Sequence, residues 1–145
     1  FKMTEGDNIT SSDLTQKWVD TLAFFGTLVD NGHKLRPIRF LIRHLIDKGY
    51  DTKLFPGSSL YDLLISIPTA NKINYDKTLR VGCDQLHNTV VFKYSDTTGL
   101  NKNDSDSLAK AFRWTDTCQL TEVNDTFEYF LTQVDSWATI KPSVK

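Results

Sequence analysis

Residues 78–95, TLRVGCDQLHNTVVFKYS, decide the fold of this chain. In each half, apolar residues alternate with polar or small ones, and the apolar set is Leu79, Val81, Cys83, Val90, Phe92 and Tyr94. Successive side chains of a β-strand point to opposite faces, so a period of two indicates two strands that share one apolar face. Because residues 85–88 form a short polar connection, the stretch predicts an antiparallel hairpin.

Two helices are predicted ahead of the hairpin. The first has apolar residues spaced by four, four, three and four positions, namely Leu14, Trp18, Leu22, Phe25 and Val29. Residues 11–13 supply polar groups for its N-terminal cap. The second begins near Arg36, where Pro37 suits the first turn, and ends at Gly49. The short connection of residues 33–35 predicts that the two helices are antiparallel neighbours.

The segment between the second helix and the hairpin has an ambiguous pattern. Residues 50–57 are predicted to form a loop. In residues 58–67, the serines at the start favour one helical turn, whereas Leu63, Ile65 and Ile67 alternate as in a strand. We expect one helical turn that leads into a strand ending at Pro68.

After the hairpin we expect an exposed loop over residues 96–107, a helical turn at 108–110 and a strand over 112–120 beside residues 90–94. An apolar stripe between Val123 and Ala138 predicts one final helix. The chain is therefore expected to be one α+β domain spanning residues 1–145. Its small, mainly antiparallel sheet would have three or four strands, with two N-terminal helices and one C-terminal helix packed on one face. Residues 1–10 and 139–145 are expected to be loose.

The composition is that of an ordinary globular protein, with 39% hydrophobic and 24% charged residues in 145. No apolar run approaches the roughly 18 residues that span a bilayer, and the first ten residues lack the apolar core of a signal peptide. These features predict a cytoplasmic protein without membrane contact. Cys83 and Cys118 are too few for a disulfide framework, and we expect both thiols to be reduced, buried and unreactive.

No motif in the sequence names a reaction. The best local set of metal ligands is Cys83, Asp84 and His87, and no second pair stands at ligand spacing elsewhere. We therefore expect no metal and no cofactor. A nucleophile would need a partnered base, and no Ser or Cys of the chain stands in such a pattern.

The net charge of −1 conceals an uneven distribution. Residues 33–53 hold six Lys or Arg against two Asp, a balance of +4, whereas residues 96–135 hold three basic and eight acidic residues, a balance of −5. On the second helix, the side away from the core presents Arg36, Arg39 and Arg43 around Phe40. Such a group can bind an acidic protein surface or a nucleic acid, or it can be a solvated face with Phe40 covered by the loop of residues 50–57.

The last helix carries Asp125, Glu128 and Asp135 on its predicted outer side. These acids either neutralise the second helix within the chain or face a basic partner. Nucleic acid is the less favoured partner of the basic helix, because six basic residues beside a large acidic region leave a weak phosphate-binding surface.

The sequence favours a non-catalytic protein-binding module of a neutralising or adaptor type. Its candidate partner-binding residues are Arg36, Arg39, Phe40, Arg43, Asp125, Glu128 and Asp135. The alternative is a small enzyme or ligand-binding protein with a site on the polar face of the sheet. The residues for that site are Arg80, Asp84, His87, Lys93 and Arg113, with His44 as a further candidate for an enzyme.

Overall fold

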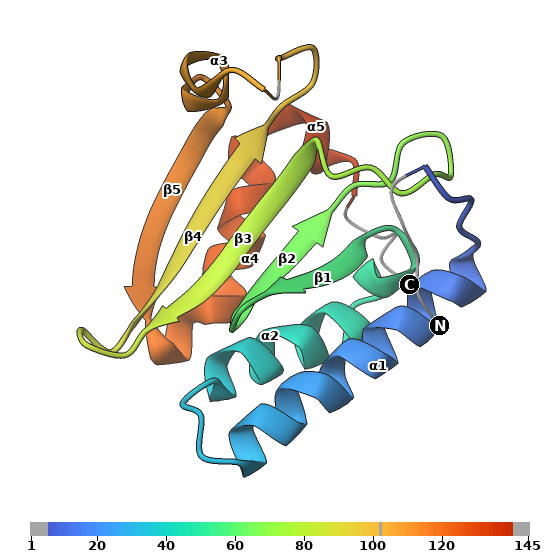
Figure 1. Cartoon of the computed structure of the whole chain (residues 1–145). Helices are drawn as coiled ribbons and strands as arrows, with labels where there is room; N and C mark the ends of the chain where they lie inside the picture. The colour runs from blue at the N-terminus through green and yellow to red at the C-terminus, as the bar shows by residue number, and fades with distance from the viewer. Residues whose placement is uncertain (1–5, 102, 141–145) are drawn as a thin grey trace.

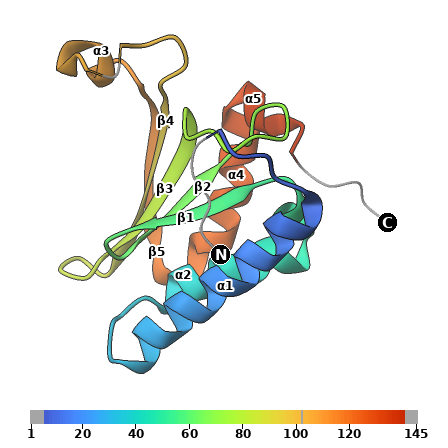
Figure 2. The ribbon, with the colours of Figure 1, turned by 45° about the vertical axis from the view of Figure 1, so that its right-hand side comes forward.

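A computed structural model describes residues 6–101 and 103–140. It shows an α+β fold with one antiparallel sheet of five strands, arranged in chain order from β1 to β5. The sheet stands at the centre of Figure 1, with β5 at one edge. Figure 2 shows α1, α2, α4 and α5 together on one side of the sheet, while the other side is open.

The strands are β1 (Phe55–Ser59), β2 (Asp62–Ser66), β3 (Lys77–Asp84), β4 (Thr89–Asp96) and β5 (Phe112–Gln119). The predicted hairpin is confirmed, because β3 and β4 pair antiparallel with Val81 opposite Phe92. The predicted pairing of the 112–120 strand with the hairpin is also confirmed, since Val90 lies opposite Cys118. Five strands replace the expected three or four.

The additional strand is β1, in a segment predicted to be a loop. Residues 50–57 instead form a short 3-10 helix, η1 (Tyr50–Thr52), and most of β1. Pro56 and Gly57 are residues typical of loops, so the sequence did not indicate a strand here. A strand can contain them in this position because β1 lies at the edge of the sheet. The helical turn expected near residue 58 is wrong, since a tight turn with Leu60 at φ 56° joins β1 to β2.

The two N-terminal helices are confirmed as α1 (Ser11–Asp30) and α2 (Arg36–Asp47). They lie side by side and run in opposite directions (Figure 1). The cap of α1 is Thr10 rather than residues 11–13. Its hydroxyl accepts a hydrogen bond from the backbone N–H of Asp13 at 3.1 Å, and the Asp13 carboxylate accepts one from the Thr10 N–H at 3.0 Å.

The last helix is broken in two, α4 (Val123–Gln133) and α5 (Asp135–Ala138), after a 3-10 turn, η2 (Leu120–Glu122). Val134 has an extended backbone at the break. In a straight helix, seven residues would separate Phe130 from Trp137 by a rise of about 10 Å. The break instead brings their ring centroids to 4.9 Å and places Trp137 5.7 Å from Tyr94. Packing of Trp137 therefore explains the break.

The loop after β4 contains α3 (Ser105–Ala109), which begins three residues before the helical turn expected at 108–110. Asp104 caps it by accepting a hydrogen bond from the backbone N–H of Asp106. Asn, Asp and Ser of this segment serve turns and caps, as their side chains compete well for local backbone groups.

The terminal segments are more ordered than expected. Ile9 is buried in a small cluster with Leu14, Phe55 and Ile73, and its N–H donates to the Asn71 carbonyl at 2.8 Å. Ile140 is also buried against the main core. Residues 1–5 and 141–145 of the predicted loose termini lie outside the described residues.

The main core lies between the helices and the covered face of the sheet. Trp18 is fully buried, and its indole N–H donates to the Leu54 carbonyl at 2.8 Å, which ties α1 to the chain entering β1. Within the described residues, no helix has both the length and the apolar character required to span a membrane.

Replacement of Thr10 by Ala should lower the free energy of unfolding by about 1 kcal/mol, because the first turn of α1 loses its capping hydroxyl. Ser11→Ala is the matched control, since Ser11 is exposed and lies one residue inside the helix. Urea unfolding followed by circular dichroism measures both. Equal stability of Thr10→Ala and the wild type would contradict the capping role.

Candidate functional site

The open face of the sheet carries a polar groove of about 560 Å³. Strand register places Arg80 opposite Lys93 on β4 and opposite Leu64 on β2. Leu79 and Val81 alternate with Arg80 and are fully buried on the other face. The sequence therefore predicted correctly that Arg80 and Lys93 lie together on the wetter face.

Asp62 is the residue of this groove that sequence reasoning missed. Its Oδ2 accepts a hydrogen bond from Nε of Arg80 at 2.6 Å, which forms a diagonal ion pair between β2 and β3. Gly82 makes room for the carboxylate, because a Cβ at this position would collide with Asp62. Only the pairing of β2 with β3 brings these residues together, and the sequence did not reveal that register.

Arg113 does not align with Arg80 and Lys93. At an irregularity in the β4–β5 pairing, Tyr94 faces Trp114 while Ser95 faces Phe112, which leaves Arg113 without a direct opposite. Lys93 faces Thr115 instead. Arg113 borders a neighbouring hollow of about 570 Å³ that includes Lys93 and Phe112.

Asp84 and His87 belong to the turn between β3 and β4. One oxygen of Asp84 accepts hydrogen bonds from the backbone N–H groups of Leu86 and His87, and the other lies 2.8 Å from Nδ1 of His87. These bonds, with the His87 side chain first, hold the pKa of Asp84 below its usual value. Both side chains fix the turn, and Asp84 also borders one end of the groove.

His44 lies elsewhere, between α2 and α4. Its Nε2 is 2.9 Å from one oxygen of Glu128, and the Tyr50 hydroxyl donates to the same carboxylate at 2.9 Å. Burial, and then the adjacent Glu128, raise the pKa of Tyr50 above its ordinary value. The structure therefore does not bring His44, Asp84, His87 and Arg113 together as one enzyme site.

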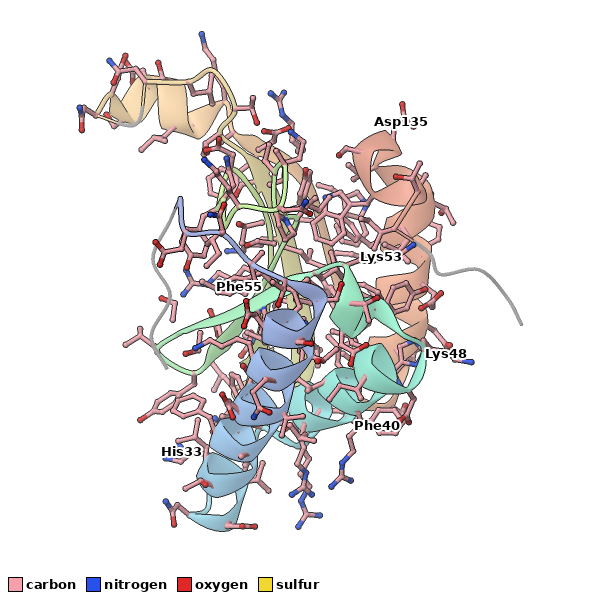
Figure 3. All side chains as sticks on the ribbon, turned by 90° about the vertical axis from the view of Figure 1, so that its right-hand side faces the viewer. His33, Phe40, Lys48, Lys53, Phe55 and Asp135 are labelled. Atoms are coloured by element: carbon pink, nitrogen blue, oxygen red, sulfur yellow. The ribbon has the colours of Figure 1, made fainter. Side chains whose placement is uncertain are left out.

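Glu128 of α4 thus contacts α2 through His44. This contact agrees with one of the two interpretations of the acidic residues, in which they pair with the second helix within the chain. Glu128 contacts His44 rather than any of the three arginines of α2. Asp125 and Asp135 remain exposed. Figure 3 shows Asp135 at the opposite end of the molecule from Phe40.

The outer side of α2 forms a second candidate site, which we call the arginine–phenylalanine face and define by Arg36, Arg39, Phe40 and Arg43. Phe40 is 54% exposed, so the chain around residue 50 does not cover it. Within the described residues, none of the three arginines forms an ion pair. The inner side of the same helix is buried through Ile38, Leu41, Ile42 and Leu45.

A hollow of about 410 Å³ lies over the arginine–phenylalanine face, with Leu120 and Thr121 of η2 on its other side. A further hollow of about 390 Å³ shares Arg36 and Leu120 and continues to Lys34. Sequence reasoning missed Leu120 and Thr121, because they reach α2 only through the long-range packing of α4 on it.

The two cysteines are free and partly buried. Burial, with the charge of Asp62 next, raises the pKa of the Cys83 thiol to about 11, and burial also raises that of Cys118. Both thiols are therefore largely protonated near neutral pH and poor nucleophiles. Within the part of the chain that the structure describes, no three His, Cys, Asp or Glu side chains are grouped to hold a metal ion.

Neither a protein-family model, nor a curated protein, nor a solved structure matches this chain. The functional interpretation therefore depends on the chemistry of the two surfaces described above.

Replacement of Tyr50 by Phe should lower the free energy of unfolding by about 1 kcal/mol near neutral pH, because Glu128 loses a hydrogen-bond donor. The wild type should also lose more stability than Tyr50→Phe as the pH rises above 10.0, the ordinary value for tyrosine. Above that pH the unfolded chain releases the Tyr50 proton while the folded chain keeps it, which favours unfolding.

Urea unfolding at about pH 8 and about pH 11 measures this difference. Tyr129→Phe is the control, because Tyr129 is 53% exposed and should retain the pH dependence of the wild type. Equal loss of stability in the wild type and Tyr50→Phe between the two pH values would show that Tyr50 does not keep its proton in the folded state.

Proposed function

We propose that this chain is a non-catalytic protein-binding module whose arginine–phenylalanine face binds an acidic surface of another protein. The observation that carries the proposal is the exposed ring of Phe40 among Arg36, Arg39 and Arg43, none of which is paired within the described residues. These four residues come from one rigid helix whose opposite side is anchored in the core.

The composition of this face suits the centre of a protein interface. Aromatic and arginine side chains are enriched there, and they include most residues whose truncation costs the most binding energy. Phe40 and Leu120 offer apolar area beside a hollow, while the arginines can donate paired hydrogen bonds to carboxylates. An acidic partner with an apolar centre would complement both features.

Nucleic acid fits this face less well. Affinity for a phosphate backbone grows with the number of phosphates neutralised, and three arginines on one helix give few such contacts. Glu122 and Asp116 lie in the neighbouring elements η2 and β5, and their charges oppose a polyanion. A compact acidic protein surface requires a much smaller region of positive potential.

The proposal predicts a specific photocrosslink from Thr121, which borders the hollow without belonging to the arginine–phenylalanine face. A variant with p-benzoylphenylalanine at Thr121 should capture an acidic protein in a lysate of the cells that naturally produce this chain. The yield should fall at least about fivefold between about 0.05 and about 0.5 M salt, because exposed charges are screened.

Two controls make the crosslinking experiment decisive. The double variant Arg39→Glu/Arg43→Glu should abolish the crosslink, whereas Lys48→Glu/Lys53→Glu, an equal change of charge at exposed positions outside the hollow, should preserve it. The same photoreactive group at Tyr129 on α4 should capture little of this partner. A crosslink that survives Arg39→Glu/Arg43→Glu, or that is equally strong from Tyr129, would contradict the proposal.

A further inference from the structure

We propose that the open face of the sheet has a separate binding site, in which Arg80 and Lys93 hold the carboxylate of a small organic acid with an apolar body. This site lies on the far side of the sheet from the helices and shares no residue with the arginine–phenylalanine face. It does not depend on the protein-binding function proposed above.

Arg80 is held in a fixed position by the chain itself. Its Nε donates to Asp62, while Nη1 and Nη2 make no hydrogen bond within the described residues. A guanidinium group with two free donors in one plane matches the two oxygens of a carboxylate. Gly82 supports this arrangement, since any side chain there would displace Asp62. Glycine in the interior of a strand usually weakens that strand. At Gly82 it has a specific role, because it leaves space for the Asp62 carboxylate.

Lys93 lies directly opposite Arg80 in the register of β3 and β4. Like charges directly opposite each other in an antiparallel strand pair destabilise that pair. An anion bound between Arg80 and Lys93 would remove the repulsion, because it would attract both side chains. Lys93 has no ion pair within the described residues. The groove is lined by these two cations and by the carboxylates of Asp62 and, at one end, Asp84, so its charged groups cancel. A neutral lining with two adjacent cations suits a monoanion better than a phosphate dianion.

The surroundings of the two cations are partly apolar. Leu64 and Val91 are half-buried in the groove, and Phe112, which is 67% exposed as a residue, borders it. The volume of about 560 Å³ lies within the range of roughly 300–1,000 Å³ that small-molecule sites occupy. A ligand with a flat apolar body could therefore lie on Leu64, Val91 and Phe112 with its carboxylate at Arg80.

A titration of the whole chain with 2-naphthoate, followed by ¹H–¹⁵N NMR spectra, tests the site. The expected Kd is below about 1 mM, with shifts centred on the amides of Leu64, Arg80, Val91 and Lys93. The neutral 2-naphthamide should bind at least about tenfold more weakly, because it lacks the charge that both cations recognise. The dianion 2-naphthyl phosphate should bind no more tightly than 2-naphthoate.

The decisive variant is Lys93→Met, which removes one charge from an exposed side chain and preserves its apolar stem. Lys93 has no ion-pair partner among the described residues, so this change breaks no internal pair there. It should weaken 2-naphthoate at least about tenfold, while Lys72→Met, at another exposed lysine, should leave the affinity unchanged. Arg80→Met should have at least the effect of Lys93→Met, and its spectrum reports whether the fold is intact.

Five results would overturn the inference: no shift up to about 10 mM 2-naphthoate, equal affinity for 2-naphthamide, tighter binding of 2-naphthyl phosphate, shifts centred on α2, or unchanged affinity in Lys93→Met. None of these results bears on the photocrosslink from Thr121. A crosslink that survives Arg39→Glu/Arg43→Glu, which would contradict the protein-binding proposal, likewise leaves the naphthoate titration unaffected, so the two proposals fail independently.

Discussion

Side chains of the strands alternate between the two faces of the sheet, and this alternation determines where the helices can pack. Strands β2 to β4 send their fully buried apolar residues to the same face, and the cross-strand pairs Val81–Phe92 and Leu79–Tyr94 align them. A helical layer must cover that face, because large apolar surfaces exposed to water are unfavourable. The same alternation sends Arg80 and Lys93 to the opposite face, where both are exposed and no helix of the described residues covers them.

Helix α2 also has one buried apolar side and one exposed polar side, here with the spacing of three and four residues that a helix requires. Its inner residues, among them Ile38 and Leu41, are fully buried against the sheet and α4, so the helix has a fixed orientation. Its outer arginines are consequently directed away from the core. The acidic character of α4 does little to neutralise them, because Glu128 is occupied by His44 and Tyr50. Within the described residues, the three arginines of α2 therefore have no ion pair with α4.

Periodicity alone predicted the elements whose residues contact their neighbours regularly. The hairpin, α1 and α2 follow from alternation or from a spacing of three and four, and their antiparallel arrangement follows from the short connections. Periodicity gave wrong predictions where contacts between residues far apart in the sequence determine the local structure. Pro56 and Gly57 are typical of a loop, yet they lie in an edge strand, and the break at Val134 depends on packing of Trp137 against Tyr94.

The candidate sites divide in the same way. Arg36, Arg39, Phe40 and Arg43 share a helix, so their common face could be predicted from spacing. Asp62 and Leu120 complete the two sites only through pairing of β2 with β3 and packing of α4 on α2, which no local pattern encodes. Arg113 was predicted to join the polar face, but an irregularity in β5 removes it from the alignment.

Hydrogen–deuterium exchange of the complex with the acidic partner tests most directly the claim that the outer side of α2 is the binding surface. We expect slower exchange in the peptides that cover residues 36–47 and 120–122, with α1 and the β1–β2 turn unchanged. Slower exchange confined to α1, or to the exposed side of α4, would contradict it.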